Sequence, residues 1–303
     1  MANWMILCWR RCNNHNTQLN KATSRQHNKS VMKNIPNLYR DAVIGRYPNA
    51  QNLRMPVVAG SQNNVIYAEI AGKTRVFKFG SADSVKKNAQ ISKLYKIHKI
   101  PCPQINIGEY NSLFFEEYEL LPGTTLFEAI QNGMEANKIK QIYREIIECF
   151  SKMDRIPGYI ISDIPNKHAH EFAKQHITNT NGATLGQICM ALVYMLNIGN
   201  NKNDAVYHSD ITPKNTIVSA DGHLVGFIDM DSVVVCNINY AFGMLAAKYI
   251  QMGFDINELI NIYNKFGTKK LSPKRIAFLA DGMNFVKKQL WEYSNNKQKQ
   301  TRQ

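Results

Sequence analysis

The sequence predicts an α+β fold of two lobes, a small β-rich N-terminal lobe and a larger helical C-terminal lobe. Three observations favour it. Short segments that alternate apolar and polar residues, as strands do, fill most of residues 55–118. Apolar residues recur at helical spacing through most of the chain after residue 123. One polar hairpin within residues 207–232 interrupts this helical part.

Length and composition fit a globular protein. The chain has 303 residues, of which 44% are hydrophobic and 20% are charged, as in a folded chain. No apolar stretch reaches the roughly 20 residues that span a bilayer. The N-terminal "WMILCWRRC" meets Arg10 and Arg11 too early for a secretory signal. The six cysteines lack a zinc-ligand spacing and are expected to be reduced. We therefore expect a cytoplasmic protein.

The net charge of +14 comes from the two ends of the chain. Residues 1–50 hold eight Lys or Arg and one acid, and residues 269–303 hold nine and two. A nucleic-acid-binding domain more often gathers its basic residues on a folded face, so no nucleic-acid partner is expected. Residues 1–31 are polar without periodicity and are predicted to be a disordered basic extension. The basic termini are expected to lie in solvent or to contact anionic surfaces.

The N-terminal lobe, residues 32–118, is predicted to be a small sheet with one helix. "VIYAEIAG" and "TRVFKFG" are predicted to form a hairpin that turns at Gly72-Lys73. A helix within residues 81–99 has Ser81 or Asp83 as its cap. The residues expected on its apolar face are Val85, Ala89, Ile91, Leu94, Tyr95 and Ile97. Two further strands are expected in "IPCPQINIGEY" and "SLFFEEYELL".

The C-terminal lobe, residues 119–303, is predicted to be mainly helical after a linker that ends at Pro122-Gly123. Its first helix has a Thr cap. The predicted helices cover residues 124–133, 137–153, 184–199, 239–253, 256–267 and 272–294.

Oxygen-bearing side chains gather around the polar hairpin. Asp210 and Asn215 are five residues apart on a loop that begins at His208 and contains Pro213. Asn215 leads into the strand "TIV", the turn "SADG" reverses the chain, and "HLVGFI" returns to Asp229. A hairpin brings Asn215 and Asp229 to the same end of two paired strands. Carboxylate and amide oxygens, together with nucleotide phosphates, suit Mg²⁺. The pattern therefore predicts a metal–phosphate site.

The motif H-x-D-x-x-x-x-N followed by Ile-Asp at a strand end is typical of phosphotransfer in the protein-kinase-like fold. Here the two parts are "HSDITPKN" and "IDMD", and they resemble those of the aminoglycoside phosphotransferase and choline kinase-type family. Upstream, "AGSQNNVIYAEIAG" resembles the family's nucleotide-covering loop, and "RVFKF" its lysine-bearing strand. The resemblance covers residues 55–250 in order. It implies a bilobal protein-kinase-like fold.

The resemblance implies a kinase that uses ATP and Mg²⁺ to phosphorylate a hydroxyl group of a small molecule. Asp210 would be the catalytic base, and Asn215 and Asp229 would hold Mg²⁺. Asp231 would either reach the metal or cap the next loop. Lys78 would neutralise phosphate charge. The other residues expected to contact the nucleotide are Gly60 and Ser61 in the covering loop and Glu117, Tyr118 and Glu119 at the adenine-binding hinge.

The chain departs from this family in the helix after the lysine strand, which normally carries a glutamate that pairs with the lysine. Residues 81–99 contain no Glu, and the interior polar candidates are Asn88 and Gln90. Lys78 is therefore expected to pair with Asp229 or with a neutral group. A second departure is the stretch "DSVVVCNINYAFG", which after Asp231 lacks the further acid that relatives often carry.

Two alternatives stay open. A protein kinase of the same fold is disfavoured by "IDMD" in place of Asp-Phe-Gly. A non-catalytic nucleotide-binding pseudokinase scaffold is favoured by the missing glutamate and opposed by the retained Asp210, Asn215 and Asp229. The acceptor is not defined. Few acids follow residue 232, so a cationic antibiotic is not specifically indicated.

Overall fold

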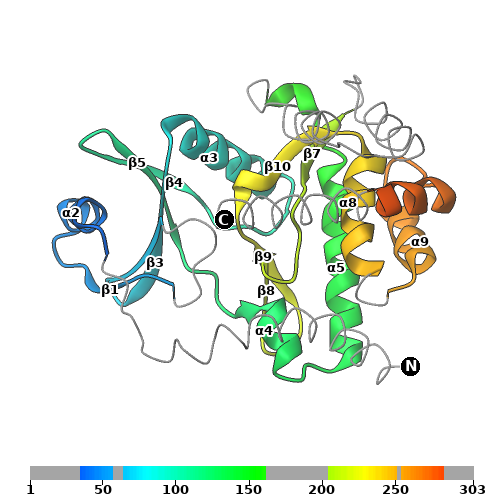
Figure 1. Cartoon of the computed structure of the whole chain (residues 1–303), viewed down its shortest axis with the longest axis horizontal. Helices are drawn as coiled ribbons and strands as arrows, with labels where there is room; N and C mark the ends of the chain where they lie inside the picture. The colour runs from blue at the N-terminus through cyan, green and yellow to red at the C-terminus, as the bar shows by residue number, and fades with distance from the viewer. Residues whose placement is uncertain (1–34, 57–63, 162–203, 251–253, 283–303) are drawn as a thin grey trace, which may run out of the picture. The chain divides into compact units, whose positions relative to one another are not determined.

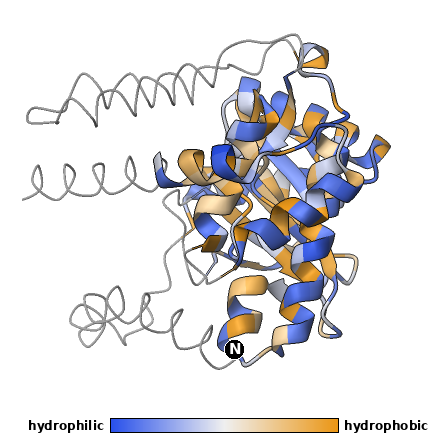
Figure 2. Cartoon of the chain, turned by 90° about the vertical axis from the view of Figure 1, so that its right-hand side faces the viewer, coloured by the Kyte–Doolittle hydropathy of each residue, from blue (hydrophilic) through white to orange (hydrophobic). Residues whose placement is uncertain are grey.

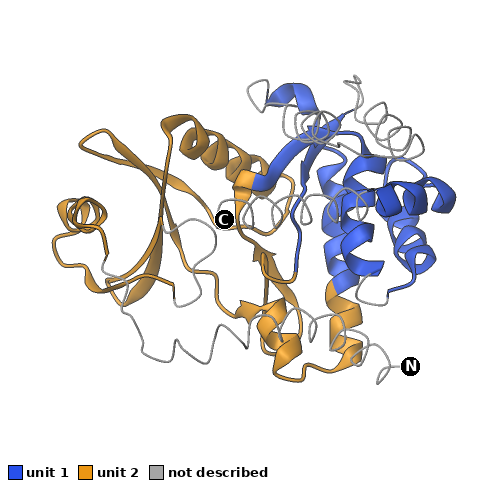
Figure 3. Cartoon of the chain, in the orientation of Figure 1, with its two compact units in different colours: residues 1–9, 143–212, 232–303 blue, residues 10–142, 213–231 orange. Residues whose placement is uncertain are grey.

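The structure is a computed structural model that describes residues 35–56, 64–161, 204–250 and 254–282. The chain forms two compact units (Figure 3). The β-rich unit comprises residues 10–142 and 213–231, and the helical unit comprises residues 1–9, 143–212 and 232–303. The predicted extension 1–31 and the predicted helix 184–199 lie outside the described residues.

The β-rich unit contains a five-stranded antiparallel sheet in the order β1-β2-β3-β5-β4 (Figure 1). The strands are β1 (Gln51–Arg54), β2 (Val65–Ile70), β3 (Lys73–Gly80), β4 (Asn106–Tyr110) and β5 (Leu113–Glu119). The sequence predicted the last four, but not β1 or the helix α2 (Asn37–Arg46) before it. Only Ala42 and Val43 of α2 are buried, too few to produce a clear helical period.

The hairpin of β2 and β3 turns one residue earlier than predicted. Its two central residues are Ala71 and Gly72, with φ of 50° and 77°. Two consecutive left-handed residues match the right-handed twist of the paired strands. Gly72 adopts this conformation without steric cost.

Helix α3 (Ala82–Ile97) follows β3 directly. Ser81 is its cap, because the Ser81 side chain accepts a hydrogen bond from the Ser84 amide. Asp83 lies in the first turn. Most of the predicted apolar face is buried, but Ile97 is 72% exposed and its prediction was wrong. Ile97 follows the buried Asn88 by nine residues, about half a turn around the helix at 3.6 residues per turn.

The two faces of the five-stranded sheet have different neighbours. On one face, Phe77, Phe79 and Phe115 pack with Ala42 and Val43 of α2 in a buried hydrophobic cluster. The other face carries Lys78 and Glu116, which are directly opposite each other on β3 and β5. Helix α3 contacts this second face through Asn88, which donates a hydrogen bond to Glu116. The lysine strand therefore has an apolar side and a polar side.

The polar hairpin forms a second sheet of the β-rich unit, in the order β6-β8-β9. Its strands are β6 (Thr124–Thr125), β8 (Thr216–Val218) and β9 (Leu224–Phe227). Strands β8 and β9 are antiparallel, as predicted. The short helix α4 (Leu126–Gln131) begins with a capping box between Thr125 and Glu128, so the predicted Thr cap is confirmed.

The helical unit holds a two-stranded antiparallel sheet of β7 (Ala205–His208) and β10 (Val233–Cys236). Its helices are the C-terminal part of α5 (Ala136–Met153), α8 (Ile238–Ile250), α9 (Ile256–Phe266) and a helix over residues 273–282. Figure 2 shows the chain coloured by hydropathy, with both hydrophobic and hydrophilic residues on its helices. Within the described ranges, no helix has the length and apolar character required to cross a membrane.

Candidate active site

The β8–β9 hairpin brings Asn215 and Asp229 to one end of the ribbon, as predicted. Thr216 is paired with Phe227, and the Ile228 amide donates a hydrogen bond to the Asn215 carbonyl over 3.0 Å. Asp229 follows with a φ of 67°, in the left-handed region. Non-glycine residues rarely adopt this conformation, and it is found preferentially at functional sites.

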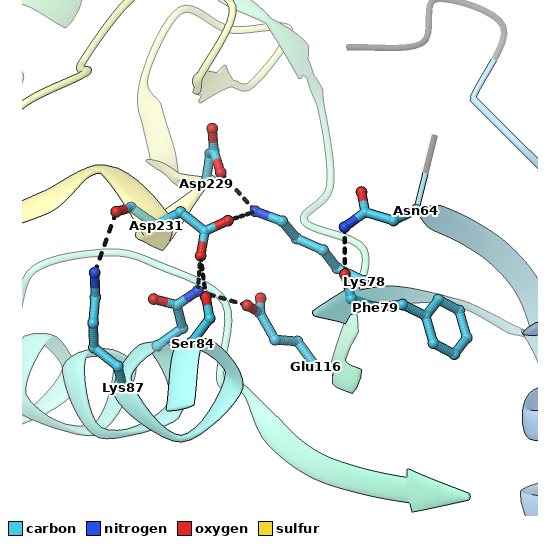
Figure 4. Close-up of polar contacts among 9 residues, drawn as sticks. Asn64, Lys78, Phe79, Ser84, Lys87, Glu116, Asp229 and Asp231 are labelled. Atoms are coloured by element: carbon cyan, nitrogen blue, oxygen red, sulfur yellow. Dashed lines mark hydrogen bonds and ion pairs between the residues drawn. The ribbon is translucent and has the colours of Figure 1, made fainter. Parts of the chain in front are cut away.

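Lys78 on β3 contacts both acids that follow β9 (Figure 4). Its Nζ lies 2.6 Å from Asp229 Oδ1 and 2.6 Å from Asp231 Oδ2. Burial by itself lowers the pKa of Lys78, but the charges of Asp229, Asp231 and Glu116 outweigh burial and raise it. Lys78 therefore stays protonated and has the acidic partner Asp229 that the sequence allowed.

Asp231 is bound by helix α3 as well as by Lys78. Its Oδ1 accepts hydrogen bonds from Ser84 Oγ over 2.8 Å and from Asn88 Nδ2 over 2.5 Å. Its backbone carbonyl accepts a hydrogen bond from Lys87 Nζ over 3.3 Å. Burial raises the pKa of Asp231, but Lys78 and these donors outweigh it, so the pKa is lowered. Asp231 is held as a carboxylate.

Glu116 is a site residue that sequence reasoning missed. It is 3% exposed, lies opposite Lys78, and accepts a hydrogen bond from Asn88 Nδ2 over 2.6 Å. Burial raises its pKa to about 7, although Lys78 and the Asn88 hydrogen bond oppose the shift. The pair "EE" inside an apolar strand was the available signal, since neighbouring strand residues point to opposite faces and one of them shares a face with Lys78.

The predicted hinge residues lie at the end of β5. Glu117 is 1% exposed and accepts from Arg46 Nε over 2.7 Å, from the Tyr47 hydroxyl over 2.5 Å, and from Arg75. Pairing of β5 with β4 ends at Glu117, so Tyr118 and Glu119 pair only with β3 among the described strands. Strand β5 is therefore paired on both sides from Phe114 to Glu117, and Tyr118 and Glu119 have no partner on the β4 side among the described strands.

Asp210, in the helical unit, follows β7. Its backbone amide donates a hydrogen bond to His208 Nδ1 over 3.2 Å, so His208 shapes this loop. Asp210 Oδ1 lies 2.6 Å from Nζ of Lys248 on α8, and the same ammonium donates to the Ser209 carbonyl over 3.3 Å. Burial lowers the pKa of Lys248, and the charge of Asp210 offsets this effect only in part. Sequence reasoning missed Lys248, which is 38 residues from its partner.

A buried carboxylate anchors the strand before Asp210. Asp154 Oδ1 accepts a hydrogen bond from the Tyr207 hydroxyl over 2.5 Å and lies 3.2 Å from Lys269 Nζ. Thr268 donates to the other oxygen of Asp154. Burial raises the pKa of Asp154, but these donors together outweigh it and lower the pKa. Strand β7 is thus tied to a carboxylate in its own unit.

The structure brings together Lys78, Asp229 and Asp231 by side-chain contacts, and the Asn215 carbonyl accepts a hydrogen bond from the amide of Ile228, the residue before Asp229. Asp210 belongs to the other unit. Gly60 and Ser61 lie outside the described residues. In the part of the chain that the structure describes, no group of three or more His, Cys, Asp or Glu side chains is placed to hold a metal. A metal here would depend on the mixed pair of an amide and a carboxylate, with other ligands from phosphate and water.

A family comparison identifies the class of protein. The sequence model of the phosphotransferase enzyme family (APH) matches residues 55–275. The chain belongs to this family. The matched range contains every predicted site residue, from Gly60 to Asp231. A search among curated proteins found no match in sequence.

Solved structures show the same fold as this family member. The GDP complex of aminoglycoside 2'-phosphotransferase-IIIa has a TM-score of 0.61 at 14% identity, covering 85% of this chain and 98% of that chain. The apo form of a thermostable mutant of aminoglycoside phosphotransferase APH(4)-Ia has a TM-score of 0.58 at 12% identity, covering 84% and 93%. Choline kinase LicA from Streptococcus pneumoniae has a TM-score of 0.56 at 12% identity, covering 85% and 90%. The predicted kinase-like α+β fold is confirmed.

Proposed function

We propose that this family member transfers the γ-phosphate of ATP to a hydroxyl group of a small molecule, with Mg²⁺ as cofactor. The observation that carries the proposal is the cluster around Lys78. A largely buried, protonated lysine contacts two carboxylates at the hairpin end that carries both Asn215 and Asp229. Asp210 lies five residues before Asn215 in the chain.

The donor chemistry at the hairpin end fits Mg²⁺. Asn215 offers an amide oxygen and Asp229 a carboxylate, and both are hard ligands of the kind Mg²⁺ takes with phosphate and water. The left-handed backbone of Asp229 is consistent with a side chain held in place for a ligand. When bound, Mg²⁺ neutralises phosphate charge.

The remaining roles follow from charge and position. Lys78 would balance phosphate charge, which is the main contribution that a protein makes to phosphoryl transfer. Asp210 would accept the proton of the substrate hydroxyl as the hydroxyl oxygen bonds to the γ-phosphorus. The bond between that phosphorus and the β–γ bridging oxygen breaks, and ADP leaves. Lys248 would keep Asp210 ionised and oriented.

The nucleotide base and phosphates would meet backbone groups. The open edge of β5 at Tyr118 and Glu119, next to Glu117, offers carbonyl and amide groups for an adenine. Gly60 and Ser61 would cover the phosphates. In this assignment residues 32–118 form the nucleotide-binding lobe, and residues 119–303 form the lobe that supplies Asp210, Asn215 and Asp229.

The solved relatives guide the choice of donors and acceptors to test. A mutant of APH(4)-Ia forms a ternary complex with ADP and hygromycin B, APH(2")-IIIa forms a complex with GDP and kanamycin, and LicA is a choline kinase. These suggest ATP and GTP as donors. Suitable acceptors are choline, the two aminoglycosides and a set of neutral sugars.

The test is phosphoryl transfer by the purified full chain with γ-labelled ATP or GTP, Mg²⁺ and this acceptor panel. Asp210→Asn is expected to lower kcat by about 10²–10⁴-fold, the usual contribution of a general base. Asp221→Asn is the matched control, because it makes the same change in the exposed turn of the hairpin. Full activity in Asp210→Asn would contradict the role of the base.

One observation favours a second candidate, a nucleotide-binding scaffold without turnover. Helix α3 presents the amide of Asn88, and no carboxylate of its own, beside Asp231 and Glu116. The same assay separates the two functions. Nucleotide binding without transfer to any acceptor would favour the scaffold.

A further inference from the structure

Helix α3 has no acid of its own to hold Lys78. Its single carboxylate is Asp83, which is exposed in the first turn. The residues that face the lysine cluster are Ser84, Lys87 and Asn88, all of which act as hydrogen-bond donors there. A helix that presents donors needs an acceptor to connect it to a cationic side chain.

Asp231 is that acceptor (Figure 4). One carboxylate oxygen is 2.6 Å from Lys78 Nζ, and the other accepts from Ser84 and Asn88 on α3. A third contact joins Lys87 to the Asp231 carbonyl. We propose that Asp231 is a positioning residue that couples helix α3 to Lys78, and so fixes the lysine for the phosphates of the bound nucleotide. The part of this proposal that concerns the nucleotide phosphates rests on the proposed function.

The neighbouring charges explain why position 88 is an amide. Asn88 Nδ2 donates to Asp231 over 2.5 Å and to Glu116 over 2.6 Å, so a single NH₂ group links two acids. A glutamate at this position would offer no donor when ionised. It would add a third carboxylate beside two that already lie close together, and like charges in a buried site oppose each other's ionisation. The acid that serves Lys78 is therefore on the loop after β9, and the helix carries the amide.

This role separates Asp231 from Asp229. Both oxygens of Asp231 are bound by protein donors, two of them from α3. Asp229 Oδ1 contacts Lys78, and the residue stands at the hairpin end with Asn215. We accordingly assign the metal to Asn215 and Asp229, and the coupling of α3 to Asp231.

The experiment compares ADP binding by the full chain in Mg²⁺ and in EDTA, for wild type, Asp231→Asn and the matched control Asp83→Asn. Asp231→Asn is expected to weaken ADP binding about tenfold in both conditions, because the loss acts through Lys78. Asp83→Asn is expected to bind as wild type does. Weakening confined to Mg²⁺ would make Asp231 a metal ligand and overturn the proposal.

A double-mutant cycle and hydrogen exchange complete the test. In a Lys78→Met background, Asp231→Asn is expected to have no further effect on ADP binding, whereas additive losses would contradict the coupling. Amide exchange in the first turns of α3 is expected to accelerate in Asp231→Asn, and to a smaller extent in Ser84→Ala, which removes one hydrogen bond. Unchanged exchange in both variants would overturn the proposal. If wild type bound no ADP, the proposed function would fail, and the exchange data would still decide the coupling.

Discussion

Lys78 and Lys248 are two largely buried lysines that differ in how many acids surround them. Their side chains are 13% and 11% exposed, and each Nζ lies 2.6 Å from a carboxylate oxygen. Burial lowers the pKa of both. Three acids around Lys78 reverse the effect and raise its pKa, whereas the single carboxylate of Asp210 leaves the pKa of Lys248 lowered.

The Lys78 ammonium beside Asp229 therefore holds its proton more tightly than a free lysine, and the Lys248 ammonium beside Asp210 holds its proton less tightly. Lys78 stabilises the folded chain below its unfolded pKa of 10.5, and this contribution is lost as the pH rises through the higher folded pKa. The contribution of Lys248 to stability changes with pH in the opposite direction. Its folded pKa is below 10.5, so the free energy of unfolding rises with pH through that window. The tightly held proton of Lys78 suits the proposed binding of phosphate. The more readily lost proton of Lys248 belongs to the lysine that is proposed to orient Asp210.

The largest expected effect is the loss of activity in Lys78→Met. Removing a group that stabilises transition-state charge is expected to lower kcat/KM for ATP by about 10²–10³-fold. Steady-state kinetics with the best acceptor measures it. A variant with wild-type kcat/KM would place the phosphates elsewhere.

Lys248→Met sharpens the contrast, since its effect should be smaller and of another kind. We expect kcat to fall about tenfold. This loss is about ten times smaller than the smallest loss usually caused by removing a general base. The KM for ATP should stay unchanged, because this lysine orients Asp210 and does not meet the nucleotide. An unchanged kcat accompanied by a raised KM for ATP would reverse the two assignments.

Stability should distinguish the lysines as well. Lys78→Met removes the ammonium that lies opposite the buried Glu116 and contacts two other acids, and is expected to lower the free energy of unfolding by about 2 kcal/mol. Lys248→Met leaves only Asp210 without its ammonium partner, and Asp210 is 43% exposed and solvated. This variant should change the free energy of unfolding by less than about 1 kcal/mol. Urea denaturation at neutral pH measures both. Equal losses of unfolding free energy in the two variants would contradict the claim that Lys78 neutralises more acids than Lys248 does.

Glu116 gives an effect on stability that depends on pH. Its pKa rises from 4.5 unfolded to about 7 in the folded chain. Between these values the folded state holds the proton that the unfolded state has lost, so the free energy of unfolding falls as the pH rises. Glu116→Gln should remove this slope, a difference of about 1–3 kcal/mol between pH 5 and pH 8. Glu109→Gln, at an exposed position on β4, is the control. A slope that persists in Glu116→Gln would show that the carboxyl titrates normally.

The sequence predicted the features that local patterns encode. The β8–β9 hairpin, the β2–β3 hairpin and the Ser81 cap each depend on residues close together in the chain, and all three were confirmed. Helix α2 was missed because only two of its residues are buried. Ile97 was placed on the apolar face because it is hydrophobic, but the buried face of α3 includes the polar Asn88 instead.

Tertiary partners of the site residues were harder to predict. Lys78 was expected to pair with Asp229 or with a neutral group, and Asp229 was correct. The link from Asp231 to α3 joins residues 143 apart, and Lys248 meets Asp210 across 38 residues. Neither spacing carries a local pattern. Glu116 was missed because its partner depends on the register between β3 and β5.

Magnesium-dependent binding of ATP, measured by calorimetry, tests the central claim most directly. We predict that Lys248→Met binds ATP and Mg²⁺ as wild type does, that Lys78→Met binds ATP at least about tenfold more weakly, and that Asp229→Asn loses the dependence on Mg²⁺. Equal affinity in all three variants would contradict the assignment of Lys78 and Asp229 to the nucleotide phosphates.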